Sequence, residues 1–441
     1  MNVGASGAGE LTVSGGTVQV GGTLKTWNGG QLTINSGTVT VGLLVNNAGA
    51  TFSHTGGTLT VDGGSLDQGG GAHQIVGSSA TAIVQLTNGA NFSPASLTLG
   101  GATAGDNGSL FVSGSTLTIG GGAGSLLDGG DGTSQLYLNG TVTLNLDDIT
   151  VDTIFVASTS DATYHQTQAG RVVTADTLRI GNSRWQGTYR HGDGSAVISG
   201  ETFVGIRGRS SDPGALIIEG GTFDTSELTV GRYSSVTLSD GLLRAGTIAP
   251  ERVGFGTFDF LGGELSVDDM QMDLLQQNGT LAAGDSPGTT ILQAYAINSG
   301  TLEVEIDWDG ATAPVGGIDF DLYTADSVDL DGDDPNDLNQ DGLGASTLEV
   351  VLLPGTAANL EEGDSFEFLT FTPGNAGGTT GVFDVLSLPA LGDDLHLVVS
   401  YNFGAGNATL TVVPEPSAFA LAALGMVVAC GGARRRRKQR G

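Results

Sequence analysis

Apolar and hydroxyl side chains alternate in short stretches along the first two-thirds of the chain. The phrase Gly-Gly-Thr-Val-Gln-Val at 15–20 returns as Ser-Gly-Thr-Val-Thr-Val at 36–41 and as Gly-Gly-Thr-Leu-Thr-Val at 56–61. Alternation over roughly four to six residues, closed by a glycine turn, is typical of a half-buried β-strand. Thr17, Thr38 and Thr58 hold the same place in the three copies, so the repeat is 21 and then 20 residues long.

A strand repeat of this length predicts a solenoid, because a single coil cannot bury its apolar face and must stack on neighbours. Looser copies at 115–119, 140–144, 220–223 and 262–267 extend the pattern, whereas 145–210 is irregular. We therefore predict an all-β fold in which residues 1–305 form a right-handed parallel β-helix with Val, Leu and Ile inside and Thr and Ser outside. An up-and-down barrel or a set of sandwiches is the alternative fold.

The sequence pattern changes after about residue 306, where the predicted strands lengthen and the turns become rich in Asp and Pro. Strand candidates are 348–353, 366–371, 395–401 and 408–413. We predict a small β-sandwich-like capping domain over 306–412, with an Asp-rich loop at 329–342.

Residues 413–441 combine three parts in a fixed order: a Pro-Glu-Pro tripeptide, an apolar stretch at 418–433 and a basic tail at 434–440. The apolar stretch is shorter than the roughly 20 residues of a comfortable membrane span, so we predict a short C-terminal transmembrane helix. Positive charge resists translocation, which would keep the tail cytoplasmic and place the preceding chain outside the inner membrane. The tripeptide is Pro414, Glu415 and Pro416, and the basic stop is Arg434, Arg435, Arg436, Arg437 and Lys438.

This order resembles the PEP-CTERM sorting signal of Gram-negative bacteria, a tail family also named the ice-binding protein C-terminal domain. The resemblance implies an exosortase-type processing enzyme as partner, an inner-membrane stage that is transient or permanent, and then the cell envelope or extracellular matrix. A plain tail anchor is the alternative. No signal peptide follows Met1, and we expect the true start to lie upstream.

The repeats are similar to those of autotransporter-type β-helical passengers. The resemblance is carried by the turn Ala283-Gly-Asp-Ser-Pro-Gly288 and the phrase Ser299-Gly-Thr-Leu302 that follows it. No outer-membrane barrel sequence follows. The resemblance therefore implies an adhesin-like architecture without the autotransporter route of secretion.

Charge is divided sharply along the chain. The first 413 residues hold ten basic and 46 acidic side chains, and the tail holds the other six basic ones. So acidic a surface repels nucleic acid, which we exclude as a partner. Nine of the ten cations are arginines between 171 and 252, and they indicate either an anion-binding face or one stretch of solvated coils. The single cysteine, Cys430, leaves no disulfide, so stability must come from backbone ladders and packing.

The Asp-rich loop is a candidate calcium site. Carboxylate and amide oxygens recur there at alternate positions, as in loops that wrap this ion. The second half of the loop fits the first positions of an EF-hand, but Leu348 stands where the last ligand would be. We expect calcium to raise the thermal midpoint of fragment 300–413; a solvated acidic loop is the alternative. The candidate ligands are Asp329, Asp331, Asp333, Asp337, Asn339 and Asp341.

Parallel β-helices also host polysaccharide lyases and hydrolases, which need clustered carboxylates with a nearby base or acid. Candidates here are the pairs Asp147–Asp148 and Asp268–Asp269 and the cluster Arg190-His191-Gly192-Asp193. The five histidines, at 54, 73, 165, 191 and 396, lack metal-ligand spacing. We expect no enzymatic activity, and a groove lined by Asp and Arg on adjacent coils would favour the enzyme instead.

Threonine pairs on one strand face, such as Thr38 with Thr40 and Thr58 with Thr60, give a further alternative, since continuous rows of hydroxyls on a flat solenoid can bind ice. Thr is also simply a good outward strand residue. The sequence as a whole favours a non-enzymatic exported protein with a structural or adhesive role. We expect exopolysaccharide as its partner.

Overall fold

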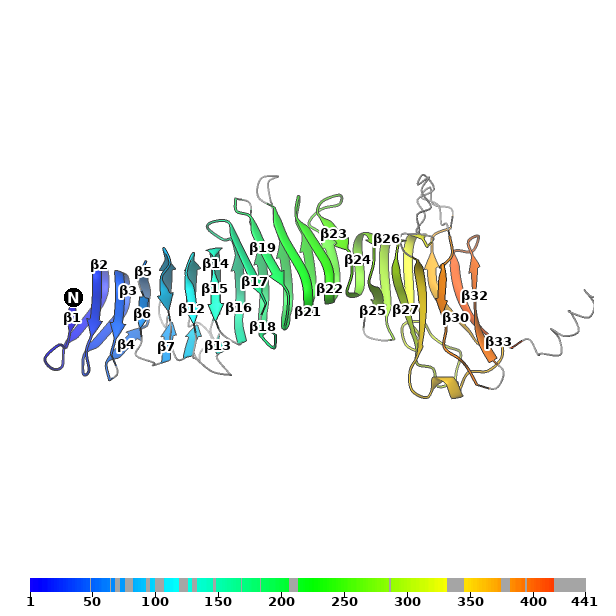
Figure 1. Ribbon diagram of the computed structural model, residues 1–441, viewed down its shortest axis with the longest axis horizontal. Helices are drawn as coiled ribbons and strands as arrows, with labels where there is room; N and C mark the ends of the chain where they lie inside the picture. Colours follow the sequence, from blue (N-terminus) through cyan, green and yellow to red (C-terminus); the bar gives the residue numbers. More distant parts are fainter. Residues whose placement is uncertain are drawn as a thin grey trace, which may run out of the picture.

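A computed structural model shows an elongated rod of stacked β-coils, with β1 at one end and β32 and β33 at the other (Figure 1). The structure describes residues 1–415 except 48, 64, 68–71, 76–81, 93–95, 100–106, 119–125, 129–132, 146–147, 168, 183, 206–212, 285–286, 331–344, 374–380 and 393–394.

The strands of the first half of the rod are β1 (Asn2–Val3), β2 (Glu10–Thr26), β3 (Gln31–Asn46), β4 (Thr51–His54), β5 (Gly57–Asp62), β6 (Ser65–Asp67), β7 (Ala72–Ile75), β8 (Ala82–Thr87), β9 (Asn91–Phe92), β10 (Ser96–Leu99), β11 (Asn107–Ser113), β12 (Thr116–Thr118), β13 (Leu126–Asp128), β14 (Thr133–Thr141), β15 (Thr143–Asn145), β16 (Asp148–Val156), β17 (Ala162–Gln166), β18 (Val172–Ile180) and β19 (Gly187–His191).

The second half contains β20 (Ser195–Val204), β21 (Gly214–Val230), β22 (Ser235–Pro250), β23 (Thr257–Phe260), β24 (Glu264–Gln276), β25 (Thr280–Ala283), β26 (Thr289–Ile297), β27 (Gly300–Ile306), β28 (Leu322–Asp329), β29 (Ser346–Leu352), the 3-10 helix η1 (Thr356–Ala358), β30 (Ser365–Phe371), β31 (Val385–Ser387), β32 (Leu395–Asn402) and β33 (Asn407–Pro414).

Each coil pairs in parallel with the next, and the register follows the sequence repeat. Thr17 lies opposite Thr38, and Thr38 lies opposite Thr58. Parallel stacking keeps chemically equivalent residues in rows along the rod, so each inward position builds a ladder rather than an isolated contact.

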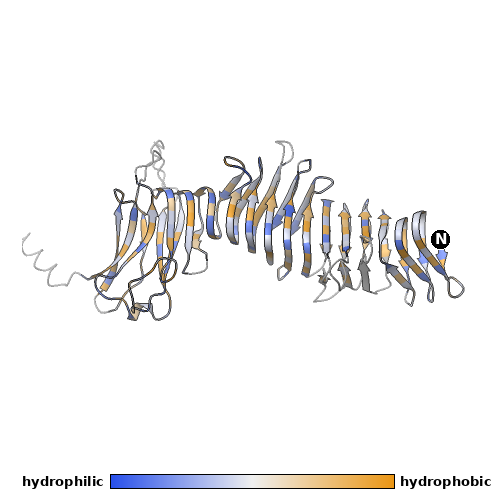
Figure 2. Ribbon diagram, turned by 180° about the vertical axis from the view of Figure 1, so that it is seen from behind, coloured by the Kyte–Doolittle hydropathy of each residue, from blue (hydrophilic) through white to orange (hydrophobic). Residues whose placement is uncertain are grey.

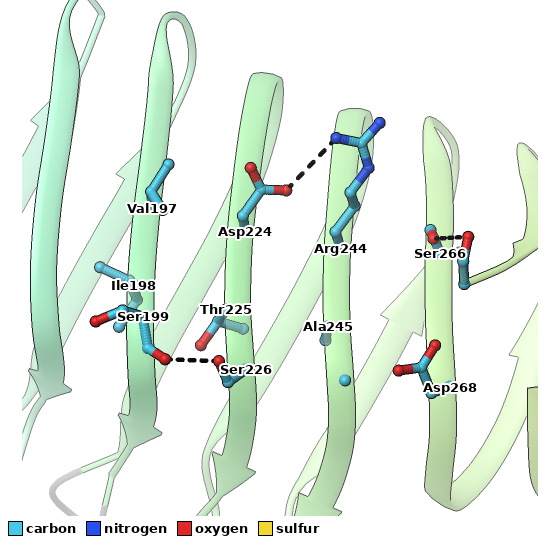
Figure 3. Close-up of a pocket in the computed structure, with 12 residues that line it drawn as sticks. Val197, Ile198, Ser199, Asp224, Thr225, Ser226, Arg244, Ala245, Ser266 and Asp268 are labelled. Atoms are coloured by element: carbon cyan, nitrogen blue, oxygen red, sulfur yellow. Dashed lines mark hydrogen bonds and ion pairs between the residues drawn. The ribbon is translucent and has the colours of Figure 1, made fainter. Parts of the chain in front are cut away.

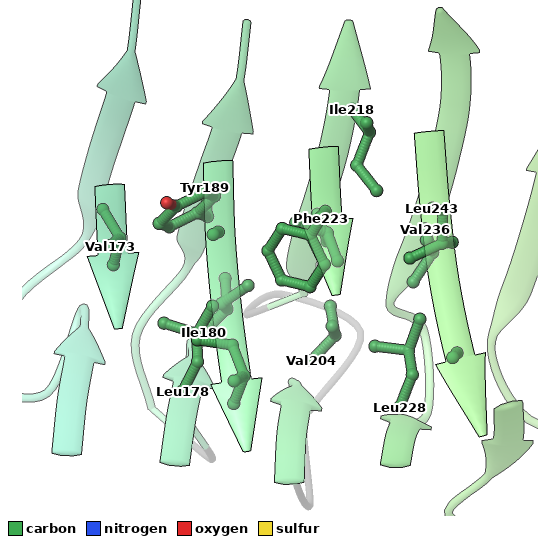
Figure 4. Packing of buried hydrophobic residues seen from close by; sticks show 14 of the residues in the cluster. Val173, Leu178, Ile180, Tyr189, Val204, Ile218, Phe223, Leu228, Val236 and Leu243 are labelled. Carbon is green, nitrogen blue, oxygen red and sulfur yellow. The ribbon is translucent and has the colours of Figure 1, made fainter. Parts of the chain in front are cut away.

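The core is a set of such ladders, and one of them runs the length of the solenoid. Starting at Val18, its successive rungs are Val39, Leu59, Val84, Leu110, Leu136, Ile154, Leu178, Thr202, Leu228, Ile248, Met270, Leu292, Ala325 and Phe371. Figure 4 shows side chains of several coils, among them Leu178 and Leu228, meeting in the interior. Because all but one of these rungs are apolar, the stack buries a continuous core without any covering layer.

One rung departs from the expected division of apolar inside and hydroxyl outside. Thr202 is fully buried, and its Oγ1 lies 2.9 Å from Oγ1 of Thr225, which is also buried. Thr225 in turn donates to the carbonyl oxygen of Glu227 at 3.0 Å. Pairing the two hydroxyls satisfies them inside the core, where an unpaired one would be costly.

A column of glycines turns the chain at one corner of successive coils. Gly241 and Gly263 have φ of 78° and 77°, in the left-handed region. A Cβ at Gly263 would lie 2.5 Å from the carbonyl oxygen of Gly241 in the coil before. Glycine is therefore required here both for the backbone angle and for the approach of the neighbouring coil.

Outward positions alternate with the buried ones, as the banded hydropathy of Figure 2 shows. One outward row is aromatic: Phe111 stacks on Tyr137 at 4.0 Å between ring centroids, and Tyr137 stacks on Phe155 at 4.5 Å. The rings lie within 3° of parallel, so each covers the face of the next. The row stabilises the stack of coils and presents mainly ring edges to solvent.

At the C-terminal end the parallel ladder continues past residue 305. β28 pairs with β26, β29 with β27, β30 with β28 and β31 with β29, all in parallel. Antiparallel pairing joins β30 to β33 and β33 to β32, which end the rod. The predicted strands at 348–353, 366–371, 395–401 and 408–413 are confirmed as β29, β30, β32 and β33.

The prediction of an all-β solenoid is thus confirmed. The right-handed winding of the β-helix and the domain boundaries at 305 and 412 stay predictions. The ladder crosses residue 305 within one sheet, and β33 includes Val413 and Pro414, which were expected to belong to the tail. The predicted transmembrane stretch 418–433 lies outside the described residues. Within the described part, no helix has the length and apolar character needed to cross a membrane.

Candidate functional site

A groove of about 460 Å³ lies on the outside of the solenoid, across β20, β21, β22 and β24 (Figure 3). Its charged lining residues are Asp224, Arg244 and Asp268. Asp224 and Arg244 are direct register partners on β21 and β22, so the parallel stack sets them side by side. The groove therefore carries Asp and Arg on adjacent coils, which is the arrangement that favours carbohydrate chemistry.

The ion pair in the groove is loose. Nη1 of Arg244 lies 3.9 Å from Oδ1 of Asp224, and both side chains keep partial exposure. Burial raises the pKa of the Asp224 carboxyl, and the nearby guanidinium opposes that shift only in part. A partly exposed pair at this distance contributes little to stability. Oδ1 of Asp224 is buried, so the more exposed Arg244 is the end that a ligand can reach.

The hydroxyl groups of the groove are engaged by the protein itself. Ser199 donates to Oδ1 of Asp176 at 2.7 Å, and Ser226 donates to the carbonyl oxygen of Ser199 at 2.6 Å. The two serine hydroxyls are thus held in fixed directions, one by a carboxylate and the other by a backbone carbonyl oxygen.

The two carboxylates of the groove come from different coils. Asp224 and Asp268 lie two coils apart, because Asp224 is opposite Arg244 and Arg244 is opposite Ser266. With a strand spacing of roughly 4.8 Å and a further offset of two residues along β24, their Cα atoms lie more than about 10 Å apart.

Of the carboxylate pairs proposed from the sequence, Asp268 and Asp269 do not converge. Asp268 packs against the backbone of Gly284 in the groove, whereas Asp269 accepts a hydrogen bond from Gln271 at 2.7 Å. Asp148 accepts the backbone N–H of Val172 at 3.0 Å, and Asp147 lies outside the described residues. Neighbours on a strand point to opposite faces, which separates Asp268 from Asp269.

The cluster at 190–193 is split in the same way. Arg190 points outward and forms an ion pair with Glu219, whose carboxylate also lies 3.7 Å from Nε2 of His165. His191 points inward against Tyr189 and Phe223. Burial lowers the pKa of His191 to about 4, and it does the same for His54. Both imidazoles are neutral at physiological pH and serve as core residues.

The calcium prediction falls almost entirely outside the described residues. Asp329 is the last residue of β28, and Asp331, Asp333, Asp337, Asn339 and Asp341 belong to 331–344. In the part of the chain that the structure describes, no group of three or more Asp, Glu, His or Cys side chains is placed to hold a metal.

The start of the predicted sorting motif is exposed at the end of the rod. Pro414 closes β33 opposite Leu395, and both Pro414 and Glu415 face solvent. Pro416 and the basic stop at 434–438 lie outside the described residues. The tripeptide therefore begins where the folded rod ends, which leaves it open to a processing enzyme.

Residues 412–437 match the PEP-CTERM protein-sorting motif. The match confirms the PEP-CTERM signal inferred from the tail. A PEP-CTERM signal implies export and recognition by an exosortase-type processing enzyme, and here it follows a β-solenoid. Comparison with curated proteins gives no match to the chain.

Reasoning from the sequence missed Asp224 and Arg244. The repeat phrase Gly-Gly-Thr-Phe-Asp at 220–224 and its neighbour Gly-Leu-Leu-Arg at 241–244 supply both residues at equivalent places. Aligning these two copies by their glycine and apolar positions would have set Asp224 beside Arg244.

Proposed function

We propose that this chain is a non-enzymatic structural or adhesive protein of the cell surface or extracellular matrix, sorted through its PEP-CTERM signal. The observation that carries the proposal is the joining of an exposed sorting motif at Pro414 to a continuous rod. A single ladder from Val18 to Phe371 makes the rod one stack, suited to bearing load and presenting surface.

In this proposal the chain is processed by an exosortase-type enzyme. Before processing, it passes through an inner-membrane intermediate. The basic stop at 434–438 would hold the tail on the cytoplasmic side until cleavage near Pro414, Glu415 and Pro416 releases it. The excess of acidic side chains in the rod argues against nucleic acid as a partner.

A carbohydrate-active enzyme is the second candidate, and the groove at Asp224, Arg244 and Asp268 is the observation in its favour. The groove serines Ser199 and Ser226 are held by acceptors of the protein itself, which argues for binding rather than bond cleavage there. Ice binding has weaker support, because Ile83 and Gln85 succeed Thr58 and Thr60 in the next coil and interrupt the hydroxyl rows.

Complementation of a strain that lacks the gene separates the structural role from the enzymatic one. The structural role predicts that the double variant Asp224→Asn with Asp268→Asn restores matrix cohesion as fully as the wild-type chain. The enzyme predicts that this variant fails while still reaching the matrix. Replacement of all three motif residues by Ala is the control, since it should abolish both matrix location and rescue.

A further inference from the structure

Two neighbouring connections of the solenoid form a second hollow, remote from the groove. They are residues 231–234, between β21 and β22, and 251–256, between β22 and β23. The backbone N–H of Gly231 donates to Val204 at 2.7 Å, and that of Glu251 donates to Val230 at 2.8 Å. Since Val204 and Val230 are register partners, the two connections turn at the same corner of successive coils.

The hollow between them, about 350 Å³, is lined by one guanidinium and two aromatic rings. The guanidinium carbon of Arg232 lies 4.5 Å from the ring centroid of Tyr233 and 4.9 Å from that of Phe255. Both contacts are made through ring faces, so the rings position the guanidinium while its N–H edges remain for a planar acceptor. The volume is at the small end of ligand pockets, which start at roughly 300 Å³.

Tyr233 is held in a conformation that its side chain disfavours. Its φ is 64°, in the left-handed region, and among the described non-glycine residues only Asn88 and Ala157 share a positive φ. For a bulky residue this conformation is strained, and such strain concentrates at ligand sites. The ring contributes little to the buried core, because 47% of Tyr233 is exposed. A glycine would satisfy the backbone better, so the ring itself points to a ligand.

The charge of the corner stands out against the rest of the rod. The ion pairs in the described part of the chain involve His165, Arg190 and Arg244, and none involves Arg232. A guanidinium that forms no ion pair with a described carboxylate, in a chain with a net charge of −31, is available for an external anion. Repulsion from distant acidic residues is screened beyond roughly 8 Å at physiological ionic strength.

We propose that the corner formed by Arg232, Tyr233 and Phe255 binds a carboxylate-bearing sugar, the uronate unit of an acidic polysaccharide. The carboxylate receives two N–H bonds from the edge of Arg232. The apolar C–H face of the pyranose ring packs on the exposed part of Tyr233. Ser235 and Thr257 line the hollow and offer hydroxyls to the sugar. This inference names a partner class for the proposed extracellular role and is tested separately from it.

Titration of the purified full chain with digalacturonate, followed by calorimetry, tests the site. We expect saturable binding, and at least tenfold weaker binding of a neutral digalactoside that lacks the carboxylates. Arg232→Ala and Tyr233→Gly should each weaken digalacturonate binding at least tenfold. Tyr233→Gly should keep or raise the thermal midpoint, since glycine accepts the local φ.

Arg184→Ala is the matched control, because Arg184 is an exposed arginine at the same corner of an earlier coil and should leave binding unchanged. Absence of binding to the wild-type chain overturns the proposal, as does equal binding of the neutral sugar. Loss in Arg232→Ala but not in Tyr233→Gly overturns the sugar site and leaves a simple anion contact. None of these outcomes alters the matrix-cohesion result, so the two proposals fail independently.

Discussion

Single glycines decide whether the coils can stack. Replacing Gly263 by Ala adds a Cβ in the left-handed region and against the carbonyl oxygen of Gly241. We expect the free energy of unfolding to fall by roughly 2–4 kcal/mol, the sum of backbone strain and a clash with rigid main chain. Chemical denaturation measures the change.

Gly170→Ala is the matched control for that substitution. Gly170 has φ of 82°, but a Cβ there would meet no atom within 4 Å. It should therefore show the backbone strain alone, roughly 1–2 kcal/mol. An equal fall in the free energy of unfolding for both substitutions would contradict a clash between the Gly263 side and the neighbouring coil.

Asp321 gives the rod a pH-dependent element of stability. Its buried carboxylate accepts the backbone N–H of Gly288 and of Glu305, each at 2.7 Å. Burial raises its pKa from 3.8 to about 6, against the opposing effect of these two bonds. The folded chain therefore keeps the proton over a range in which the unfolded chain has lost it. The contribution of Asp321 to stability is largest below pH 3.8 and is lost as pH rises towards 6.

Comparison with Asp321→Asn isolates this titration. The wild-type free energy of unfolding minus that of the variant should fall by up to about 3 kcal/mol between pH 4 and pH 6.5. Urea unfolding at several pH values provides the measurement. A difference that is flat with pH, or that rises, would show that Asp321 is ionised throughout.

At the scale of elements, aromatic stacking joins β11, β14 and β16 on the outside of the rod. Tyr137 is covered on both faces by Phe111 and Phe155. A double-mutant cycle with Phe111→Ala and Tyr137→Ala should give a coupling free energy of about 0.5–1.5 kcal/mol. The distant pair Phe111→Ala and Tyr401→Ala should be additive, and equal coupling in both cycles would contradict direct stacking.

The sequence predicts elements well wherever the repeat is regular. Equal spacing of Thr17, Thr38 and Thr58 fixes the register of the first coils, because a parallel stack pairs equivalent positions. Between β14 and β22 the coils vary in length: Gln135 pairs with Thr153, whereas Ser195 pairs with Thr222. Insertions at corners change the spacing without disturbing the ladder, so a pattern that relies on constant period loses the register there.

Candidate sites are harder to predict for the same reason. Asp224 and Arg244 come from adjacent coils, and Arg232 and Phe255 come from successive connections at one corner of the solenoid. Each contact depends on register, whereas pairs adjacent in sequence, such as Asp268 and Asp269, diverge on the strand. The sorting motif could be found in the sequence because its three parts are contiguous and need no tertiary contact.

At the scale of the whole molecule, the solenoid and the PEP-CTERM signal have separate roles. The rod supplies a long surface whose stability accumulates from coil to coil, and the signal supplies an address at the end of β33. Because neighbouring coils support one another, a local defect such as Gly263→Ala should weaken the stack without altering the address.

The most direct test of this account is the intact mass and cellular location of the chain expressed in its own host, with any upstream sequence restored. Sorting through the signal predicts a species in the envelope or matrix that has lost the mass beyond the Pro414–Pro416 motif. The variant with all three motif residues replaced by Ala should stay uncleaved. A full-length wild-type species retained in the inner membrane would contradict sorting by this signal and the extracellular role built on it.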